Sequence, residues 1–479
     1  MKQVSSFISS FSKYKKCFLM VVFTFVFCVI IERVLCFFLV SDVLGNGSSW
    51  ERALFHEFYE QEEIDNLFLG SSHVFYNVIP EQLDEINGEK NFNLTTGVQP
   101  YNGSYYLLKE ADRKFDLSHV YLEMYYAVPV YHADYNELSV LTRNWDILYQ
   151  MPFSYNKFAY MCEMSDKEYY SMTFFETRRF ADDIFDLESI KNNVTIKTGE
   201  NYKQHRFVSY DNGEQEFYAR KGYFYTEAEY EGDVFGTSTG GFVPFEENPI
   251  GDMPEQYLRK IIEYCQKNDI EITLFTSPMP DYGLFGMGNY DVYVEKVNEI
   301  AGEYGISYYD FNLCNTEYLE LLDTSYFCDG EHMNVAGAEK FTSVLGTVMQ
   351  AEKNSALPED MFYETYQEKI AAIGNRILGL QYYVVNDSEK IAQIEKELDD
   401  FDAEKERLYA MHLISTGEVQ TEYRISKIPE GQKEKTVMQD WSEQIYFAVP
   451  KEENGTIYIE IKIGNEIKTI SPIYYSKME

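Results

Sequence analysis

Apolar and mixed stretches alternate along the chain between residues 66 and 349, and this alternation predicts strands separated by helices. Short segments predict strands at 66–69, which reads as a buried strand, and at 90–94, 119–124, 271–275 and 306–311. Amphipathic runs between them predict helices that start at Pro80 and cover 104–114, 254–267, 290–304 and 335–349. Strands that alternate with helices of this length predict an α/β domain, with a parallel sheet covered on both faces.

An aromatic stretch, residues 131–250, interrupts this alternation. It contains Tyr169–Tyr170, Phe174–Phe175, an aromatic run around Tyr223 and a glycine-rich run near Gly240. Because a structureless loop of that length is implausible inside a compact domain, the stretch is predicted to be a mixed insertion. Two interpretations stay open. The insertion either covers one end of the sheet as a lid or substrate platform, or it has no role at a site.

The pattern changes after Pro358, where alternating apolar residues and frequent turn signals replace the helical periodicity. Strands are predicted at 377–385, 408–414 and 458–463. A helix between the first two is predicted from the spacing of Ile391, Ile394, Leu398 and Phe401. Turns at these intervals are typical of a small β-sandwich, so we expect a separate β-rich domain. Such a domain either binds a partner or polymer, or acts as a spacer.

The strongest hydrophobic signal lies near the N-terminus, where every residue from Cys17 to Ile31 except Thr24 is apolar. A second apolar run, 34–40, follows the pair Glu32–Arg33. Together the two runs reach the roughly 20 residues that a helix needs to cross the hydrocarbon core of a bilayer. We therefore expect a transmembrane anchor at 17–40, with the charged pair near the far interface, where long side chains extend to water.

The charges beside this anchor predict its orientation. Lys2, Lys13, Lys15 and Lys16 precede it without any acid, and acidic residues become frequent after Asp42. By the positive-inside rule, the N-terminus is cytoplasmic and the main body of this single-pass cell-membrane protein is extracytoplasmic. A cleaved signal peptide is the alternative, but no small-x-small site follows the apolar run.

Composition narrows the range of functions. A chain of 479 residues predicts two or three domains. Its formal net charge of −38 argues against nucleic acid as a partner, because phosphates require Lys and Arg surfaces. The cysteines outside the anchor lack the spacing of zinc ligands, although they could form two disulfides: Cys162, Cys265, Cys314 and Cys328. The sequence also has no glycine-rich phosphate loop, so no cofactor and no metal are expected.

Candidate chemistry lies in two segments that are far apart in the sequence. The first predicted strand ends in Gly70-Ser71-Ser72-His73, and a later loop places Asp329 and His332 just before a helix. At that spacing, a carboxylate can bind one imidazole nitrogen and leave the other as a general base for a serine. Each segment alone is a weak signal. Their combination indicates serine catalysis, because both follow predicted strands, whose carboxyl ends gather functional groups in parallel sheets.

This combination resembles the SGNH/GDSL hydrolase superfamily. The G-D-S block of that family would read Gly70-Ser71-Ser72, and its D-x-x-H block would read Asp329-Gly330-Glu331-His332. The resemblance implies that Ser72 is the nucleophile, His332 the base and Asp329 the group that orients it. It covers about 60–130 and 250–350, and it implies a flavodoxin-like, three-layer α/β/α domain.

The serine at the second position of the first block is found in a membrane-anchored, cell-envelope branch of the family. That branch is similar to the D-alanyl transfer protein of teichoic acid modification and to the alginate O-acetylation proteins. Both work beside a membrane-bound O-acyltransferase. The resemblance therefore implies an acylated envelope polymer as substrate and a multi-pass O-acyltransferase as a partner.

The same resemblance implies an oxyanion hole built from the N–H of Ser72, the N–H of a glycine and an asparagine side chain. Gly97, in the loop after the second predicted strand, matches the glycine. The asparagine is absent, because the sequence after 119–124 reads YYAVP where G-x-N-D is expected. Either another donor replaces it, namely Asn102 or a Tyr hydroxyl, or the hole is incomplete.

The other histidines carry weaker signals. His73 follows Ser72 directly, and adjacent side chains on a tight turn diverge, so we expect it to pack or to contact substrate. The remaining histidines have no partner pattern and are expected to be ordinary core or surface residues: His56, His119, His132, His205 and His412.

We expect the chain to be organised as a cytoplasmic N-terminus (1–16), a transmembrane anchor (17–40), a tether (41–60), the first part of an SGNH-like domain (61–130), the insertion (131–250), the second part of that domain (251–356) and a C-terminal β-rich domain (359–479). The expected function is that of a membrane-anchored, extracytoplasmic serine esterase or O-acyltransferase acting on cell-envelope polysaccharide or a teichoic-type polymer. The alternative is a catalytically inactive assembly or glycan-binding protein with the same fold.

Overall fold

The computed structural model describes residues 2–40, 49–131, 134–211, 214–237, 242–354, 357–396 and 401–477. His132, Gly240, Leu398 and residues 41–48 of the expected tether lie outside these ranges. Contacts divide the chain into two compact units. The N-terminal unit comprises Met1–Tyr59 and Tyr135–Ser209, and the main unit comprises Glu60–Asp134 and Tyr210–Glu479.

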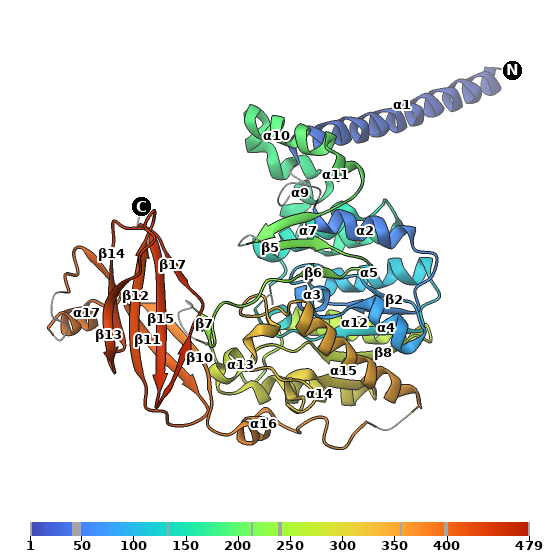
Figure 1. Ribbon diagram of the computed structural model, residues 1–479. Helices are drawn as coiled ribbons and strands as arrows, with labels where there is room; N and C mark the ends of the chain where they lie inside the picture. The colour runs from blue at the N-terminus through green and yellow to red at the C-terminus, as the bar shows by residue number, and fades with distance from the viewer. Residues whose placement is uncertain are drawn as a thin grey trace. The chain divides into compact units, whose positions relative to one another are not determined.

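A five-stranded parallel sheet forms the centre of the main unit (Figure 1). Its strands are β1 (Asn66–Leu69), β2 (Asn91–Asn93), β3 (His119–Glu123), β8 (Glu271–Thr276) and β9 (Ser307–Asp310). Their order, β2-β1-β3-β8-β9, is the order of flavodoxin-like doubly wound sheets. The prediction of an α/β fold with a parallel sheet is confirmed. Every residue of β1, β2 and β3 is buried, as a sheet covered on both faces requires.

Helices cover both faces of this sheet. They are α4 (Pro80–Asn87), α5 (Tyr101–Lys114), α12 (Asp252–Lys267), α14 (Tyr290–Tyr304) and α15 (Val335–Asn354). The chain runs from β1 to β2 in one direction along the sheet, and from β2 to β9 in the other. Right-handed crossovers therefore place α4 on one face and α5, α12 and α14 on the other. The contacts of α15 with α4, and of α12 with α5, agree with this arrangement.

The sequence explains where these helices begin and which side they bury. Pro80 occupies the first turn of α4, where its missing N–H costs nothing, and Gly88 ends the helix with a φ of 75°. Along α12, the buried side chains recur at helical spacing: Tyr257, Leu258, Ile261, Ile262 and Cys265. This apolar stripe faces the sheet and α5, and the charged residues of α12 face water.

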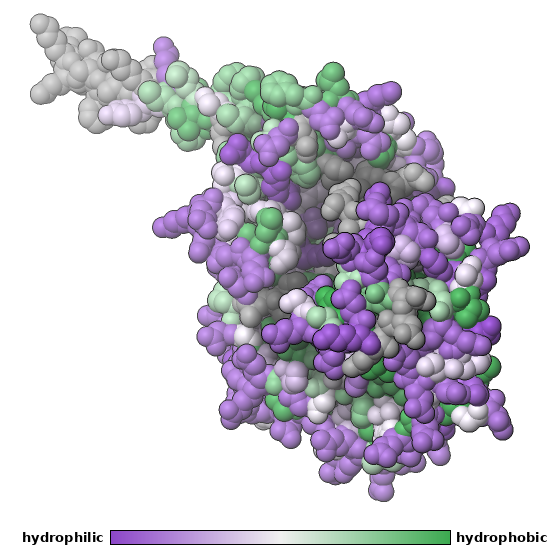
Figure 2. Space-filling model, turned by 90° about the vertical axis from the view of Figure 1, so that its left-hand side faces the viewer, coloured by the Kyte–Doolittle hydropathy of each residue, from purple (hydrophilic) through white to green (hydrophobic). Residues whose placement is uncertain are grey.

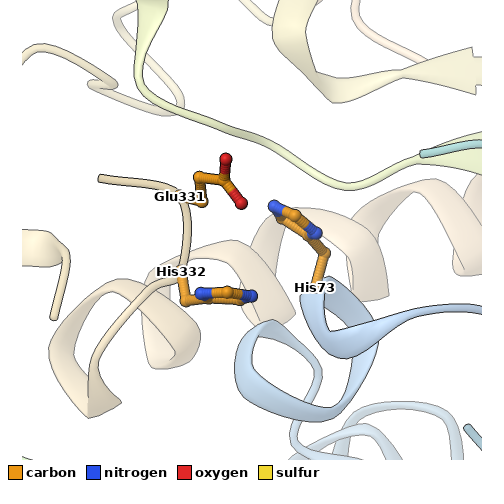
Figure 3. Close-up of side chains that lie close together, drawn as sticks. All are labelled: His73, Glu331 and His332. Carbon is orange, nitrogen blue, oxygen red and sulfur yellow. The ribbon is translucent and has the colours of Figure 1, made fainter. Parts of the chain in front are cut away.

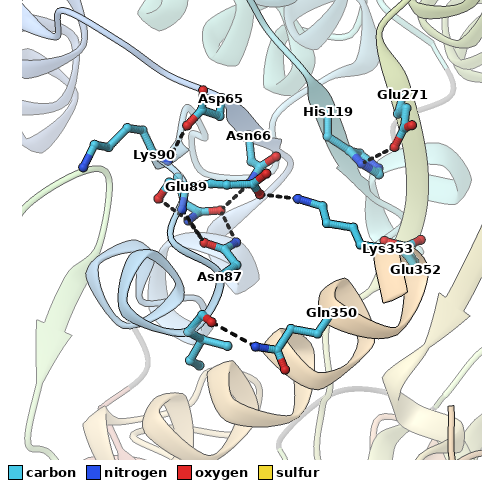
Figure 4. Close-up of polar contacts among 12 residues, drawn as sticks. Asp65, Asn66, Asn87, Glu89, Lys90, His119, Glu271, Gln350, Glu352 and Lys353 are labelled. Atoms are coloured by element: carbon cyan, nitrogen blue, oxygen red, sulfur yellow. Dashed lines mark hydrogen bonds and ion pairs between the residues drawn. The ribbon is translucent and has the colours of Figure 1, made fainter. Parts of the chain in front are cut away.

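Polar contacts tie the strands together at their amino ends (Figure 4). The Asn66 side chain donates to Glu89 and to Asn91, at 2.8 and 2.9 Å, and Lys353 of α15 pairs with Glu89. His119 Nδ1 lies 3.3 Å from the Glu271 carboxylate at the start of β8. Burial lowers the pKa of His119 to about 4, so this histidine is neutral and structural.

The C-terminal part of the main unit consists of two further sheets (orange and red in Figure 1). One contains β14 (Tyr446–Pro450), β11 (Glu406–Ser415), β10 (Ile377–Val384) and β7 (Phe235–Thr237). The other contains β13 (Thr436–Ser442), β12 (Glu422–Pro429), β15 (Gly455–Ile463), β16 (Glu466–Thr469) and β17 (Ile473–Tyr475). Leu380, Tyr409, Ile425 and Ile459 belong to one apolar cluster that both sheets share. The strands expected at 377–385, 408–414 and 458–463 correspond to β10, β11 and β15.

Two details of this region differ from the sequence-based expectation. The helix expected from Ile391 to Phe401 is the shorter α17 (Ser388–Ile394), and Phe401 is not helical. The strand β7 comes from the stretch expected to be an insertion, and it pairs in parallel with β10. Residues more than 130 positions apart therefore share one sheet, which no local pattern in the sequence indicates.

The stretch 131–250 is divided between the two units. Residues 135–209 belong to the N-terminal unit, and their helices are α7 (Leu138–Gln150), α8 (Tyr155–Glu163), η1 (Lys167–Tyr169), α9 (Tyr170–Phe174), η2 (Glu176–Phe185), α10 (Leu187–Thr198) and α11 (Glu200–Lys203). The same unit contains α1 (Lys2–Leu39) and α2 (Trp50–Glu60), which occupies part of the expected tether. Later residues form β4 (Val208–Asp211), β5 (Glu214–Tyr218), β6 (Phe224–Thr226) and β7.

Among the described residues, α1 alone is long and apolar enough to cross a membrane, over Tyr14–Leu39. By length and composition this helix fits a membrane span or a signal sequence. The short elements that complete the main unit are α3 (Ser72–Asn77), α6 (Ala127–Tyr131), α13 (Asp281–Met287), η3 (Phe311–Leu313), η4 (Thr324–Tyr326) and α16 (Tyr366–Ile373).

A fully buried ion pair joins α16 to α13 and gives a test of the packing. Lys369 Nζ lies 2.9 Å from Asp281 and donates to the Asn312 carbonyl at 2.8 Å. Lys369→Met leaves the Asp281 carboxylate buried without its cation, so we expect a loss of about 3–5 kcal/mol in unfolding free energy. Equilibrium urea denaturation of the detergent-solubilised chain measures this loss.

The matched control is Lys405→Met, because Lys405 pairs with Asp402 on the surface. We expect its denaturation curve to coincide with that of the unmodified chain. A Lys369→Met curve that also coincides would contradict the structural role of the buried pair.

Candidate active site

The turn after β1 places two serines at the start of α3. Ser71 precedes the helix, and its hydroxyl accepts the N–H of His73 at 3.2 Å. Its own N–H donates to the Glu123 carboxylate at 2.6 Å. A Cβ at Gly70 would lie only 2.5 Å from the Cβ of Glu123, so only glycine fits here. Ser72 is the first residue of α3, and its N–H makes no hydrogen bond to any residue that the structure describes.

The structure brings Ser72, His332 and Asp329 together. The Ser72 hydroxyl Oγ lies 2.8 Å from His332 Nε2, and His332 Nδ1 lies 2.9 Å from the Asp329 carboxylate. These three side chains form one hydrogen-bonded series at the carboxyl edge of the parallel sheet. The spacing allows His332 to take a proton from Ser72 while Asp329 holds the imidazole ring in one orientation.

Local hydrogen bonds shape the loop that carries His332. The Asp329 carboxylate accepts the N–H groups of Glu331 and His332, each at 2.7 Å, so the D-x-x-H segment closes on itself. The N–H of Met333 donates to the Asn77 side chain at 3.1 Å, which connects the loop to α3. Because Asn77 and Ser72 lie on the same short helix, this bond fixes the distance between the serine and the histidine.

Electrostatics within this series suit a base and its supporting carboxylate. Burial acts to lower the pKa of His332, but the negative charge and hydrogen bond of Asp329 outweigh it and raise the pKa above 6.5. Partial burial acts to raise the pKa of Asp329, but attraction to His332 and three hydrogen bonds lower it to about 2. Asp329 is therefore ionised at neutral pH, and it stabilises the imidazolium form of His332.

Glu123 is a site residue that the sequence-based reasoning did not select. It ends β3, its side chain is buried, and it supports the Ser71–Ser72 turn through the N–H of Ser71. Burial raises the pKa of Glu123 to about 7, although the hydrogen bond from Ser71 opposes this shift. An acid in an otherwise apolar buried strand was the only available signal, and it could not reveal which turn the side chain contacts.

His73, Glu331 and His332 also lie together, as Figure 3 shows. Their ligand atoms are all within 4.8 Å of one another, a spacing that fits a metal ion. Both nitrogens of His332 already bind Ser72 and Asp329, so a metal on His332 would break that series. His73 is fully buried, and its ring lies 4.0 Å from the Tyr125 ring, so packing is its principal role here. Burial holds the pKa of His73 well below its ordinary value, so the ring is neutral.

One part of the aromatic stretch reaches this site. Phe224 of β6 packs on Tyr76, with ring centroids 5.1 Å apart, and the Tyr76 ring lies 4.8 Å from the His332 ring. The β6 segment of the insertion therefore lies next to the site through Tyr76, and its role as a substrate platform stays a prediction. Residues 135–209 belong to the N-terminal unit.

The predicted oxyanion donors follow β2, the neighbour of β1. Gly97 lies in the loop after β2, and its N–H makes no hydrogen bond to any described residue. Asn102 lies in the first turn of α5 and is fully buried. Within the described part of the chain, its side-chain nitrogen Nδ2 has no hydrogen-bond partner. An unpaired buried donor is costly, which makes Asn102 a candidate for binding a group that the structure does not contain.

Other features of the described chain lie away from this series. All seven cysteines are free thiols, so the disulfides that the sequence allowed are not formed here. A cavity of about 490 Å³ is lined by residues of α13, α14 and α16, and it contains none of Ser72, Asp329 and His332.

Comparisons with known proteins leave the family open. No protein-family model matches the chain, and no curated protein matches it. A solved structure from Bacteroides fragilis, provisionally assigned as an acylhydrolase, aligns with 64% of this chain and 99% of its own. The identity is 11% and the TM-score is 0.29, which is too low for this likeness to carry an argument about function.

The contact between His332 and Asp329 predicts a measurable titration shift. Because the ionised carboxylate raises the pKa of His332, Asp329→Asn is expected to lower it. At a pH between the two values, His332 is protonated in the unmodified protein and neutral in the variant. A pH titration by NMR of the full chain, isotope-labelled at histidine, measures both values.

The matched control is Asp323→Asn. Asp323 lies near the same loop and caps η4, and its carboxylate accepts hydrogen bonds from the N–H and hydroxyl of Ser325. We expect this change to leave the His332 titration unmoved. Equal His332 pKa values in Asp329→Asn and the unmodified protein would contradict the pairing.

Proposed function

We propose that this protein is a serine-dependent acyl hydrolase or O-acyltransferase, with Ser72 as nucleophile, His332 as general base and Asp329 as its orienting carboxylate. The observation that carries the proposal is the 2.8 Å contact between Ser72 Oγ and His332 Nε2, continued by the 2.9 Å contact to Asp329. A base that is itself oriented by a carboxylate is the arrangement that activates a serine hydroxyl.

The chemistry follows from these contacts. His332 takes the proton from Ser72 as its oxygen attacks an ester carbonyl, and the resulting oxyanion receives hydrogen bonds from N–H groups. We propose the N–H groups of Ser72 and Gly97 as the donors, with the Asn102 side chain as a third. Collapse of the intermediate breaks the ester bond, and His332 returns the proton to the leaving alcohol. An acyl group then remains on Ser72.

The second half of the reaction regenerates the serine. His332 removes a proton from water or from a sugar hydroxyl, and that oxygen attacks the acyl group on Ser72. Water gives hydrolysis, and a sugar hydroxyl gives acyl transfer. Both halves need neutral His332 at the start, so the rate is expected to rise with pH as His332 loses its proton.

The G-x-S and D-x-x-H blocks support assignment to the SGNH hydrolase superfamily, and their position at the carboxyl edge of a doubly wound sheet supports it further. We propose that the substrate is an acylated polysaccharide or teichoic-type polymer of the cell envelope. Tyr76, which is partly exposed and lies beside His332, supports a sugar-containing substrate, because sugar rings stack on aromatic faces. A multi-pass membrane O-acyltransferase is the proposed partner.

We further propose that α1 is retained as a membrane anchor, with its lysine-bearing end in the cytoplasm. The end of the helix makes specific contacts that support retention over cleavage. Glu32 accepts the hydroxyl of Thr177 at 2.8 Å, and Arg33 pairs with Glu176 at 3.2 Å. Removing α1 would leave Glu176 and Thr177 without these partners.

The alternative, an inactive protein that only assembles or binds glycan, draws its support from the missing G-x-N-D asparagine. The hydrogen bond between Ser72 and His332 favours an enzyme, because a serine without a catalytic role does not need that geometry.

Covalent labelling tests the nucleophile. The full chain is expected to react with a fluorophosphonate, and peptide mapping by mass spectrometry is expected to find the adduct on Ser72. Ser72→Ala should abolish labelling, because it removes the attacking oxygen. The adjacent Ser71→Ala variant keeps that oxygen and should still label at residue 72. Equal labelling of Ser72→Ala and the unmodified chain would contradict the proposal.

Ester hydrolysis tests the substitute oxyanion donor. If Asn102 donates to the oxyanion, Asn102→Ala should lower kcat for p-nitrophenyl acetate by about 10²–10³-fold, with little change in KM. The unfolding midpoint of the variant serves as the control for packing. An unchanged kcat in a folded Asn102→Ala variant would show that the hole is completed without this side chain.

A further inference from the structure

The N-terminal unit exposes an unusual number of large apolar side chains. We define the platform surface as Phe153, Phe158, Phe175, Ile184, Phe185 and Leu187. Phe153, Phe185 and Leu187 are 81%, 88% and 78% exposed, so these side chains are almost fully accessible. Figure 2 shows apolar residues gathered at the end of this unit from which α1 projects. Exposed apolar patches of this kind mark surfaces that bind a protein or a membrane.

The elements that carry the platform surface are those that hold the end of α1. Phe175 directly precedes Glu176, which pairs with Arg33. Leu187 begins α10, and further along α10 Asn193 donates to the Phe38 carbonyl at 3.0 Å. Phe158 packs against Phe174, next to Phe175, with ring centroids 6.2 Å apart. The surface is therefore continuous with the end of the apolar helix.

The length of α1 gives an independent reason to place this surface at a membrane. From Glu32 onward one side of the helix contacts protein, where Cys36, Leu39 and Val40 are buried, and the other side exposes Val34, Phe37 and Phe38. The apolar segment that precedes this contact is Cys17–Ile31, about 15 residues or about 22 Å at the helical rise. A hydrocarbon core is about 30 Å thick, so this segment is too short by about 8 Å. Helices that lie in the interface enter a bilayer by about 5–10 Å, which matches the shortfall.

We propose that the platform surface lies in the interfacial zone of the bilayer that α1 spans, with lipid as its occupant. This inference rests on the proposed anchoring by α1. Immersion of the platform surface brings the exposed Val34, Phe37 and Phe38 of α1 into the bilayer, which closes the gap between the length of Cys17–Ile31 and the hydrocarbon thickness. The contact is hydrophobic and not electrostatic, because Asp186 and Glu188 beside Phe185 and Leu187 carry the same sign as lipid phosphates. The membrane then holds the N-terminal unit at two places and fixes its tilt.

Tryptophan quenching by brominated lipid tests this placement in the full chain. The protein is reconstituted in phosphatidylcholine vesicles whose acyl chains are brominated near the headgroup. Phe185→Trp and Leu187→Trp each add one indole on the platform surface, and the signal of Trp50, Trp145 and Trp441 is subtracted using the unmodified chain. We expect the added fluorescence of both variants to be lost in brominated vesicles and retained in unbrominated ones.

Two control variants separate the possible outcomes. Phe27→Trp places the indole on the exposed apolar segment of α1, and Tyr474→Trp places it at an exposed position of β17. The inference requires quenching at positions 27, 185 and 187 and none at 474. If position 27 is quenched and positions 185 and 187 behave like 474, the platform inference is wrong and the anchor stands. If position 27 is not quenched, both the anchor and the inference fail.

Discussion

The hydrogen bond from the Ser71 N–H to the buried Glu123 carboxylate is the contact on which the geometry of the site depends. It joins the ends of two neighbouring parallel strands, β1 and β3, and it requires glycine at position 70 because no Cβ fits beside Glu123. The turn it holds opens α3 with Ser72 at its first position. A serine at a helix start has its N–H free, which suits a nucleophile whose product is an oxyanion.

The histidine reaches this serine through a second set of contacts, mostly local to its own loop. Asp329 accepts hydrogen bonds from two backbone N–H groups and from the imidazole Nδ1, so the segment 329–332 stabilises its own conformation. The contact between Asn77 and the Met333 N–H then sets this loop against α3. The proposed catalytic series therefore combines a rigid local motif with one long-range contact, and the electrostatic effect of Asp329 on His332 follows from that geometry.

The proposed catalytic role and the proposed membrane contact belong to different units. The main unit carries the parallel sheet, the Ser72 site and the C-terminal sheets, whose strand β7 comes from a distant part of the chain. Within the N-terminal unit, Glu176, Thr177 and Asn193 contact the end of α1. The same unit exposes large apolar side chains of its own. A helix that is held in this way cannot rotate freely against its unit, so anchoring by α1 would also orient the unit at a membrane.

The sequence alone predicted the strands of the central sheet, because short strand-like segments alternate with helical segments, and it selected Ser72, Asp329 and His332 through two short motifs. Each motif lies within four consecutive residues, so its spacing is visible in the sequence. Tertiary structure decided the partnership of Glu123 with the Ser71 turn, the approach of Phe224 to Tyr76 and the assignment of residues 135–209 to the unit of α1. Each of these depends on contacts between residues far apart in the chain, which periodicity and motif spacing do not record.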